Sequence, residues 1–255
     1  MTVRRPDLEE WFLVHQLRAL GRRHFHLPVR FDADVTALVA AWDEAGQPVP
    51  VTAVLARALG LWARRRPEVN RMVFDTVFGL RVVDFPYVNV NVPVLIRDGD
   101  RPHLSACIVR DADRCTVAEI EAQIRAARER RLQDLPVGRI FAGNRNTLWN
   151  RLRLRLIHFL VYNVPQLYVR KGGGGLSLST LMRRPDPALH LRAPSYGPTA
   201  VTVFAHGIRR DGARALLELD IGFDHYALPG HIALDAVMDL GALLAHDGLR
   251  DLGPG

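Results

Sequence analysis

Cysteine is scarce in this chain: its 255 residues include only Cys107 and Cys115. Two thiols cannot form the dense disulfide framework of a small secreted domain, and their number fits a reducing compartment. No metal-like spacing surrounds either one, so we interpret both as ordinary thiols and expect no metal site.

Long apolar runs are also missing. The most apolar long stretch, residues 152–169, is interrupted by polar residues and is shorter than the ~20 apolar residues that span a bilayer. The N-terminus has arginines but no apolar run behind them, which argues against a signal peptide. We therefore expect a cytoplasmic protein without a membrane span.

Lysine is nearly absent as well. The net charge of +7 comes almost wholly from arginine, and Lys171 is the only lysine. Arginine binds phosphates well, so a polyanionic cofactor, an acidic carrier protein or nucleic acid would fit. Because the arginines are dispersed along the chain, a composition bias is the simpler explanation. No nucleic-acid-binding motif is present, so we expect no nucleic-acid partner.

What is present indicates one large domain over residues 1–255, with 48% hydrophobic residues to build a core. Hairpins mixed with helices predict a mixed or antiparallel sheet covered by helices. Thr52 and Thr116 are candidate N-caps, and residues 137–170, the least readable part, are predicted to form one or two helices over a sheet. The predicted helices are residues 7–22, 35–45, 53–65, 117–133 and 228–246, and the predicted strands are 24–34, 71–85, 87–96, 176–182, 200–210 and 215–225.

The segment FDHYALPG, residues 223–230, carries the clearest chemical signal. The preceding strand delivers Asp224 and His225 to its end, and a turn with Pro229 and Gly230 leads into the last helix. A strand end is a rigid platform that can hold an imidazole where a general base is needed. A lone histidine is nevertheless more often structural.

This segment resembles the D-H-R-x-x-D-G motif of the dihydrolipoamide acyltransferase catalytic domain, a relative of chloramphenicol acetyltransferase. GGGGLSLSTLM, residues 172–182, is similar to that family's G-G-T-F-T-I-S-x-L-G and aligns Ser179 with its serine. Residues 50–70 and 87–124 resemble the family's upstream helix and central strand pair. The resemblance is colinear over nearly the whole chain and weakest in residues 137–170.

The resemblance implies a chloramphenicol acetyltransferase-like α/β fold, a two-layer sandwich with a mixed sheet, assembled as a homotrimer. It implies an acyltransferase in which His225 is the general base and Ser179 donates to the oxyanion, supported by Asp224 and Gly230. The two catalytic residues would come from different subunits. The donor would be a coenzyme A thioester or an acyl carrier protein, and the acceptor a small-molecule thiol, hydroxyl or amine. Because the resemblance covers only the catalytic domain, we expect neither a lipoyl domain nor a subunit-binding domain.

Two departures from the motif favour a rival hypothesis. Tyr226 replaces its arginine and Pro229 replaces its aspartate, which in the family is treated as structural and paired with an arginine. A retained partner arginine would then lack its counter-charge in a partly buried turn. The rival is therefore a trimeric scaffold of the same fold without activity. Because His225 and Ser179 are both retained, the active enzyme is the favoured interpretation.

Other chemical candidates are weaker. Ser177 shares a strand face with Ser179 and is interpreted as a plain strand residue. The glycine run lacks the Gly-Lys-Ser/Thr of a phosphate loop. His24 and His26 could line a channel or bind a metal, but an exposed strand is the favoured interpretation. His231 has no recognised metal spacing, and Asp224 is interpreted as an orienting or ion-paired carboxylate.

Overall fold

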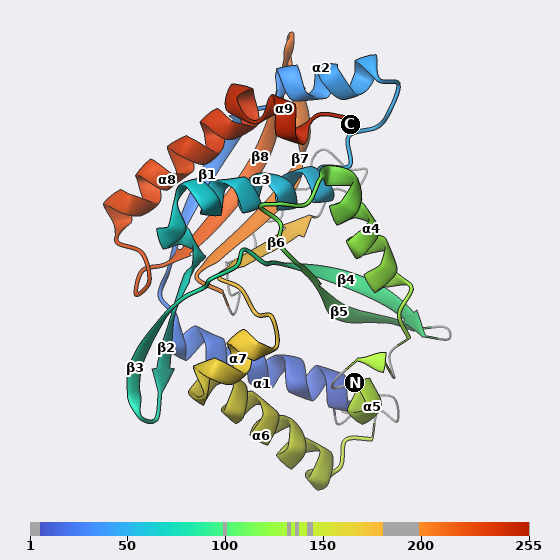
Figure 1. Ribbon diagram of the computed structural model, residues 1–255. Coiled ribbons are helices and arrows are strands. Elements are labelled where there is room, and N and C mark those ends of the chain that lie inside the picture. The colour runs from blue at the N-terminus through green and yellow to red at the C-terminus, as the bar shows by residue number, and fades with distance from the viewer. Residues whose placement is uncertain are drawn as a thin grey trace, which may run out of the picture.

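The computed structural model describes residues 6–98, 101–131, 134–135, 138–141, 145–180 and 199–254. These form a six-stranded sheet in the order β1-β8-β7-β6-β4-β5 and a separate β2-β3 hairpin (Figure 1). Strand β6 is parallel to β4 and β7, and the other pairs are antiparallel, which confirms the predicted mixed sheet. The strands are β1 His26–Asp34, β2 Arg71–Thr76, β3 Gly79–Asp84, β4 Val90–Asp98, β5 Arg101–Val109, β6 Leu176–Thr180, β7 Val201–Asp211 and β8 Arg214–Asp224.

The helices fall into two groups (Figure 1). Helices α2, α3, α4, α8 and α9 lie along the main sheet, whereas α1, α6 and α7 gather near the β2-β3 hairpin. Among the described residues, no helix has the length and apolar composition needed to cross a bilayer. The helices are α1 Leu8–Arg23, α2 Thr36–Glu44, α3 Val51–Arg65, η1 Pro67–Asn70, α4 Val117–Arg128, α5 Gly138–Phe141, α6 Leu148–Asn163, α7 Pro165–Arg170, α8 Gly230–Ala242, the π-helical η3 Leu243–Asp247 and α9 Leu249–Leu252.

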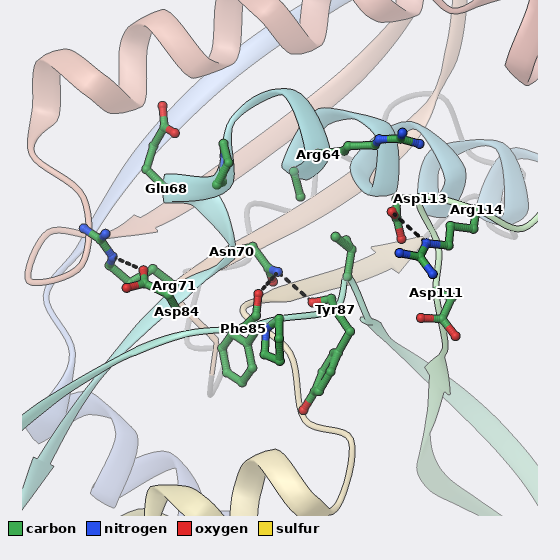
Figure 2. Close-up of a pocket in the computed structure, with 14 residues that line it drawn as sticks. Arg64, Glu68, Asn70, Arg71, Asp84, Phe85, Tyr87, Asp111, Asp113 and Arg114 are labelled. Carbon is green, nitrogen blue, oxygen red and sulfur yellow. Dashed lines mark hydrogen bonds and ion pairs between the residues drawn. The ribbon is translucent and has the colours of Figure 1, made fainter.

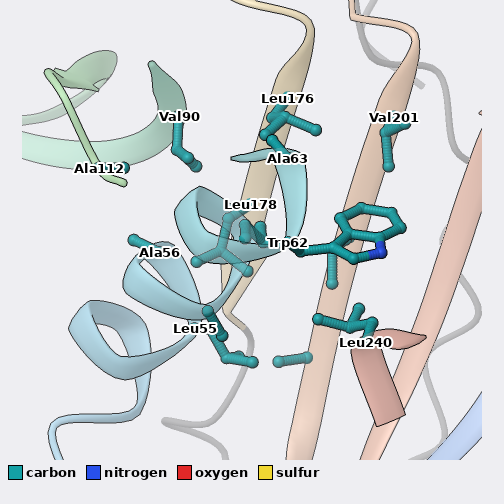
Figure 3. Close-up of a cluster of buried hydrophobic side chains, with 14 of the residues drawn as sticks. Leu55, Ala56, Trp62, Ala63, Val90, Ala112, Leu176, Leu178, Val201 and Leu240 are labelled. Carbon is teal, nitrogen blue, oxygen red and sulfur yellow. The ribbon is translucent and has the colours of Figure 1, made fainter. Parts of the chain in front are cut away.

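Helix α3 forms the centre of the core. Its alanines and leucines favour a helix, and the helix ends just before Pro67. Trp62 is fully buried among residues of α3, β6, β7 and α8 (Figure 3), and its indole N–H donates to the Ala236 carbonyl at 2.7 Å. Satisfying that N–H in the core joins α3 to α8. Truncating a buried tryptophan of this kind costs about 3–5 kcal/mol of stability.

The two predicted caps have different outcomes. Thr116 caps α4 in a full capping box with Glu119, as predicted. The prediction for Thr52 is wrong: α3 begins at Val51, two residues before the predicted start, and its N-cap residue Pro50 makes no side-chain cap. The Thr52 hydroxyl instead lies 3.0 Å from the Thr180 hydroxyl and joins α3 to the end of β6. The Thr52 side chain, which the sequence pattern predicted to be an N-cap, therefore makes a tertiary contact instead.

Residues 137–170 contain helices, as predicted, but these helices do not cover the main sheet. Helix α6 contacts α1, α7 and strand β2 of the hairpin. Its inward face is narrow, with Leu154, His158, Tyr162 and Asn163 buried. The segment therefore builds a second layer around the β2-β3 hairpin, at one end of the molecule (Figure 1).

Candidate active site

His225 is the first residue after β8, and its side chain is exposed in the single chain. Its Nδ1 lies 3.1 Å from the Leu228 carbonyl oxygen, inside the turn before α8. A carbonyl oxygen only accepts, so Nδ1 carries the proton and donates it. Nε2 then holds the lone pair that a base requires. A main-chain carbonyl therefore orients the His225 ring.

Asp224 ties the His225 turn to the segment before β1. Its carboxylate is 1% exposed, and it accepts from the His24 Nδ1 at 2.7 Å and from the Tyr226 backbone N–H at 3.1 Å. The His225 backbone N–H donates to the Phe25 carbonyl at 2.7 Å. A buried carboxylate needs such donors, and here they come from both sides of the turn. Asp224 is a hydrogen-bonded carboxylate that holds the turn in place.

The expectation that His24 and His26 lie on an exposed strand is wrong. The His24 side chain is 5% exposed against Asp224, because the carboxylate draws the imidazole into the interior. Both ring nitrogens of His26 are buried and have no hydrogen-bond partner among the described residues. Burial lowers the pKa of His26, opposed by Asp224 and assisted by His24. The described residues contain no cluster of three or more metal-ligating side chains.

Ser179 lies on β6, on the side of the sheet opposite its buried leucines. Leu176 and Leu178 are fully buried, whereas Ser177 and Ser179 alternate with them and are half-buried. The Ser177 hydroxyl accepts from the Thr199 hydroxyl at 2.8 Å, which fits a structural strand residue. The last two residues of the predicted strand, 181 and 182, lie outside the described residues.

The glycine run before β6 is a crossing point of the backbone. Gly172 has a φ of +79°, a conformation that residues with a Cβ avoid. At Gly174 a Cβ would lie 2.4 Å from the Asn89 carbonyl oxygen, so a side chain has no room there. The Asn89 side-chain amide donates to the Gly172 carbonyl at 2.8 Å. The run therefore lets the chain pass against β4 and sets the position of Ser179.

A histidine–aspartate pair that sequence reasoning missed lies on the β7-β8 hairpin, whose strand β7 pairs with the strand of Ser179. The backbone register pairs Ser179 with Phe204 and Phe204 with Asp220. Two residues beyond Phe204, the His206 Nε2 lies 2.8 Å from an Asp220 carboxylate oxygen. The sequence signal is an outward histidine and an outward aspartate on the two strands of one hairpin. The pairing also depends on the β-bulge between Ala205 and Gly207.

Ser179 and His225 cannot meet within one chain. Ser179 is two strands from β8, and His225 is five residues beyond its register partner Asp220. At about 4.8 Å per strand and about 3.4 Å per residue, their Cα atoms are roughly 20 Å apart. Joint action on one substrate requires hydrogen-bond reach of about 3 Å. A site containing both residues therefore needs two chains.

The turn after His225 is partly buried, as expected, because Ala227 and Leu228 are buried. Pro229 itself is exposed in the single chain and precedes α8 with a φ of −59°. An arginine beside an exposed proline stays hydrated, and the cost of a buried unpaired charge does not arise. Gly230 begins α8, and Tyr226 is exposed. His231 is exposed on α8.

A cavity of about 560 Å³ lies between the end of α3, the β3-β4 connection and the turn before α4 (Figure 2). Its charged side chains include the ion pairs Arg71–Asp84, at 2.6 Å, and Arg114–Asp113, at 3.8 Å. Neither His225 nor Ser179 lines it. The cavity is thus separate from both candidate residues.

Cys107 and Cys115 are free thiols, and burial raises the pKa of each.

Comparison with known proteins identifies the fold. No protein-family model matches the sequence, and no curated protein matches it. The structure is similar to the dihydrolipoamide acetyltransferase of Azotobacter vinelandii, with a TM-score of 0.64 and 17% identity over 98% of this chain and 94% of that one. That protein was studied for the role of a serine, a histidine and an asparagine in its catalytic mechanism.

Two further solved structures agree. The truncated catalytic core of the 2-oxoacid dehydrogenase multienzyme complex from Thermoplasma acidophilum gives a TM-score of 0.66 at 18% identity, over 96% of this chain and 99% of that one. A chloramphenicol acetyltransferase gives 0.50 at 14% identity, over 96% and 98%. The chain therefore has the fold of chloramphenicol acetyltransferase and of the catalytic cores of the dihydrolipoamide acetyltransferases, as the sequence resemblance implied.

Proposed function

We propose that this chain is an acyltransferase that moves an acyl group from a thioester to a thiol, hydroxyl or amine. The donor is coenzyme A or the phosphopantetheine of an acyl carrier protein. His225 is the general base and Ser179 the oxyanion donor. The observation that carries the proposal is the His225 ring, exposed at the end of β8, with Nδ1 held by the Leu228 carbonyl and Nε2 free to take a proton.

The proposed reaction is direct transfer without an acyl-enzyme. The His225 Nε2 removes the proton from the acceptor as the acceptor attacks the thioester carbonyl carbon. The Ser179 hydroxyl donates to the oxyanion of the tetrahedral intermediate, an effect typically worth about 3 kcal/mol. The intermediate then expels the donor thiolate, and the thiolate takes the proton from Nε2. His225 ends in its starting state.

We propose that the active form is a homotrimer, with His225 of one subunit facing Ser179 of the next. The separation of the two residues within one chain supports this arrangement. Large apolar side chains are exposed on the segments that flank His225, which a neighbouring subunit would cover. They are Phe25, Tyr226, Leu234 and Met238.

A scaffold without activity is the second candidate, and the residues after His225 are what favours it. In the Azotobacter enzyme the asparagine named with the catalytic residues stands four residues after the histidine. In the register we propose, Pro229 holds that position and offers neither a side-chain amide nor an N–H. We favour the active enzyme because His225 takes its orientation from the Leu228 main chain, which this replacement leaves intact.

A thioester panel tests the proposal. The purified chain is incubated with coenzyme A thioesters of different acyl lengths and with thiol, alcohol and amine acceptors, and the released thiol is measured. We expect acceptor-dependent release for at least one pair, abolished in His225→Ala. A correctly folded trimer that releases no thiol from coenzyme A or carrier-protein thioesters would instead support the scaffold.

A further inference from the structure

Helix α6 turns an apolar face away from the protein. Six large apolar side chains on it are between 37% and 74% exposed. At about 100° per residue, they occupy a sector of about 120°, roughly opposite buried Leu154 and His158. We call this sector the α6 stripe. Its members are Leu148, Trp149, Leu152, Leu156, Phe159 and Leu160.

The charges of α6 are all positive. The helix contains Arg151, Arg153 and Arg155 and neither aspartate nor glutamate. At the same helical spacing, Arg153 and Arg155 border the stripe on its two sides. Arg153 lies over the Trp149 ring at 5.6 Å and Arg155 over the Trp11 ring at 5.5 Å. No ion pair of these three arginines occurs among those of the described residues.

The helix also occupies an outer position. In Figure 1 it lies at the bottom edge of the molecule, and α1 and α7 lie between it and the main sheet. The inner face of α6 packs on α1, α7 and β2. Solvent-exposed Leu13 and Val14 lie on α1, the helix packed beside it. The stripe is therefore free to meet a broad surface.

We propose that the α6 stripe seats the protein on an anionic lipid bilayer, with α6 lying in the plane of the interface. An apolar sector bordered by arginines is the pattern of a helix that buries its apolar face at the headgroup boundary. Trp149 is suited to that depth because its ring is apolar and its N–H is polar. Sixteen residues, about 24 Å of helix, carry too much charge to cross the membrane.

The α6 stripe of a second copy is a poorer match for the same face. Two α6 stripes packed face to face would bring the arginine borders of one helix against those of the other, with no carboxylate on either helix. An anionic headgroup layer supplies both an apolar surface and the opposite charge. Charge complementarity therefore selects the membrane.

The test is sedimentation of the full-length protein with phosphatidylcholine vesicles, with and without phosphatidylglycerol. We expect binding to the anionic vesicles only, weakened by salt. Leu156→Glu should weaken this binding at least about tenfold, since it places a charge in the apolar contact. The matched control is Leu80→Glu on β3, where the leucine is 66% exposed against 57% for Leu156 and lies outside the stripe; it should bind as wild type.

Arg153→Gln together with Arg155→Gln should remove the preference for anionic vesicles. The proposal is overturned if the wild-type protein fails to bind them, or if Leu156→Glu and Leu80→Glu behave alike. Absence of vesicle binding with a lower oligomeric mass in Leu156→Glu would show that the stripe joins copies of the chain. Vesicle binding is measured without substrate, so its outcome is independent of the proposed acyl transfer.

Discussion

His225 and Ser179 sit on the same sheet in opposite settings. His225 is exposed at a strand end, and its ring is positioned by one main-chain carbonyl, with buried Asp224 beneath the turn. Ser179 is half-buried on β6, next to the strand that carries His206. The His225 ring is oriented to take a proton, whereas Ser179 lies on a face of the sheet. Neither residue lines the cavity of about 560 Å³, and under the proposed function each would supply half of a site.

This difference shows where the assembly matters. A base that works at a water-filled surface gains little from its position, because solvent competes for its proton and screens nearby charges. Covering His225 with the Ser179 face of a neighbour would exclude that water and complete the constellation. The following substitutions test whether His225 and Ser179 have these different roles.

The largest effect is expected for His225→Ala. Removing the general base should lower turnover about a thousandfold or more, while the trimer stays intact because the ring makes one hydrogen bond. Thiol release measures the rate, and light scattering measures the mass. His231→Ala, also an exposed histidine near the start of α8, is the control and should keep wild-type turnover. Wild-type rates in His225→Ala would remove the base assignment.

Ser179→Ala should lower turnover about a hundredfold, with little change in KM, because its hydroxyl acts on the oxyanion. Ser177→Ala is the matched control on the same strand. It loses the hydrogen bond from Thr199, so it should lower thermal stability but leave turnover near wild type. Equal losses of turnover in both variants would show that the strand, rather than the Ser179 hydroxyl, matters.

His206→Gln tests whether His206 or His225 is the general base. If His225 is the base, this substitution should lower turnover less than about tenfold, because it changes only a side chain on the strand next to Ser179. The reverse ranking, with His206→Gln inactive and His225→Ala active, would move the base to the His206–Asp220 pair. Both variants are compared in the same thiol-release assay, with circular dichroism to check folding.

The smallest effect concerns pH and stability. Burial lowers the pKa of His26 below its ordinary value of 6.5, so below that pH the unfolded chain takes up a proton that the folded chain refuses. The free energy of unfolding is therefore highest above about pH 6.5 and falls as pH drops toward the lower folded pKa, by at most about 1.4 kcal/mol per pH unit. Urea titrations at neutral and mildly acidic pH measure this slope.

His26→Gln should flatten the slope, whereas the exposed control His231→Gln should leave it unchanged. An unchanged slope in His26→Gln would mean that the imidazole is not held neutral by burial.

The His225 end of the sheet could be predicted because its determinants are local. Alternating residues gave the β7-β8 hairpin, and Pro229 with Gly230 marked the turn into α8. The fold could be predicted because several motifs of the family occur in the family's order along this chain, and each motif corresponds to one or two helices or strands. Local sequence was sufficient wherever residues adjacent in the chain determine the structure.

The other features depend on contacts that sequence spacing does not contain. The His206–Asp220 pair needs the register of a bulged hairpin. The burial of His24 needs Asp224, two hundred residues away. The arginines of α6 look dispersed along the chain, and they border an exposed stripe only once one face of the helix has packed inward. Helical periodicity does not tell which face that is.

Subunit mixing tests the central claim most directly. His225→Ala and Ser179→Ala chains, each strongly impaired, are co-expressed with different tags and purified as mixed trimers. If each site takes its histidine from one subunit and its serine from the next, every mixed trimer contains one intact site, so roughly a third of the sites should be restored. Thiol release near that fraction is the predicted result. Mixed trimers as inactive as the parents would contradict a site shared between subunits.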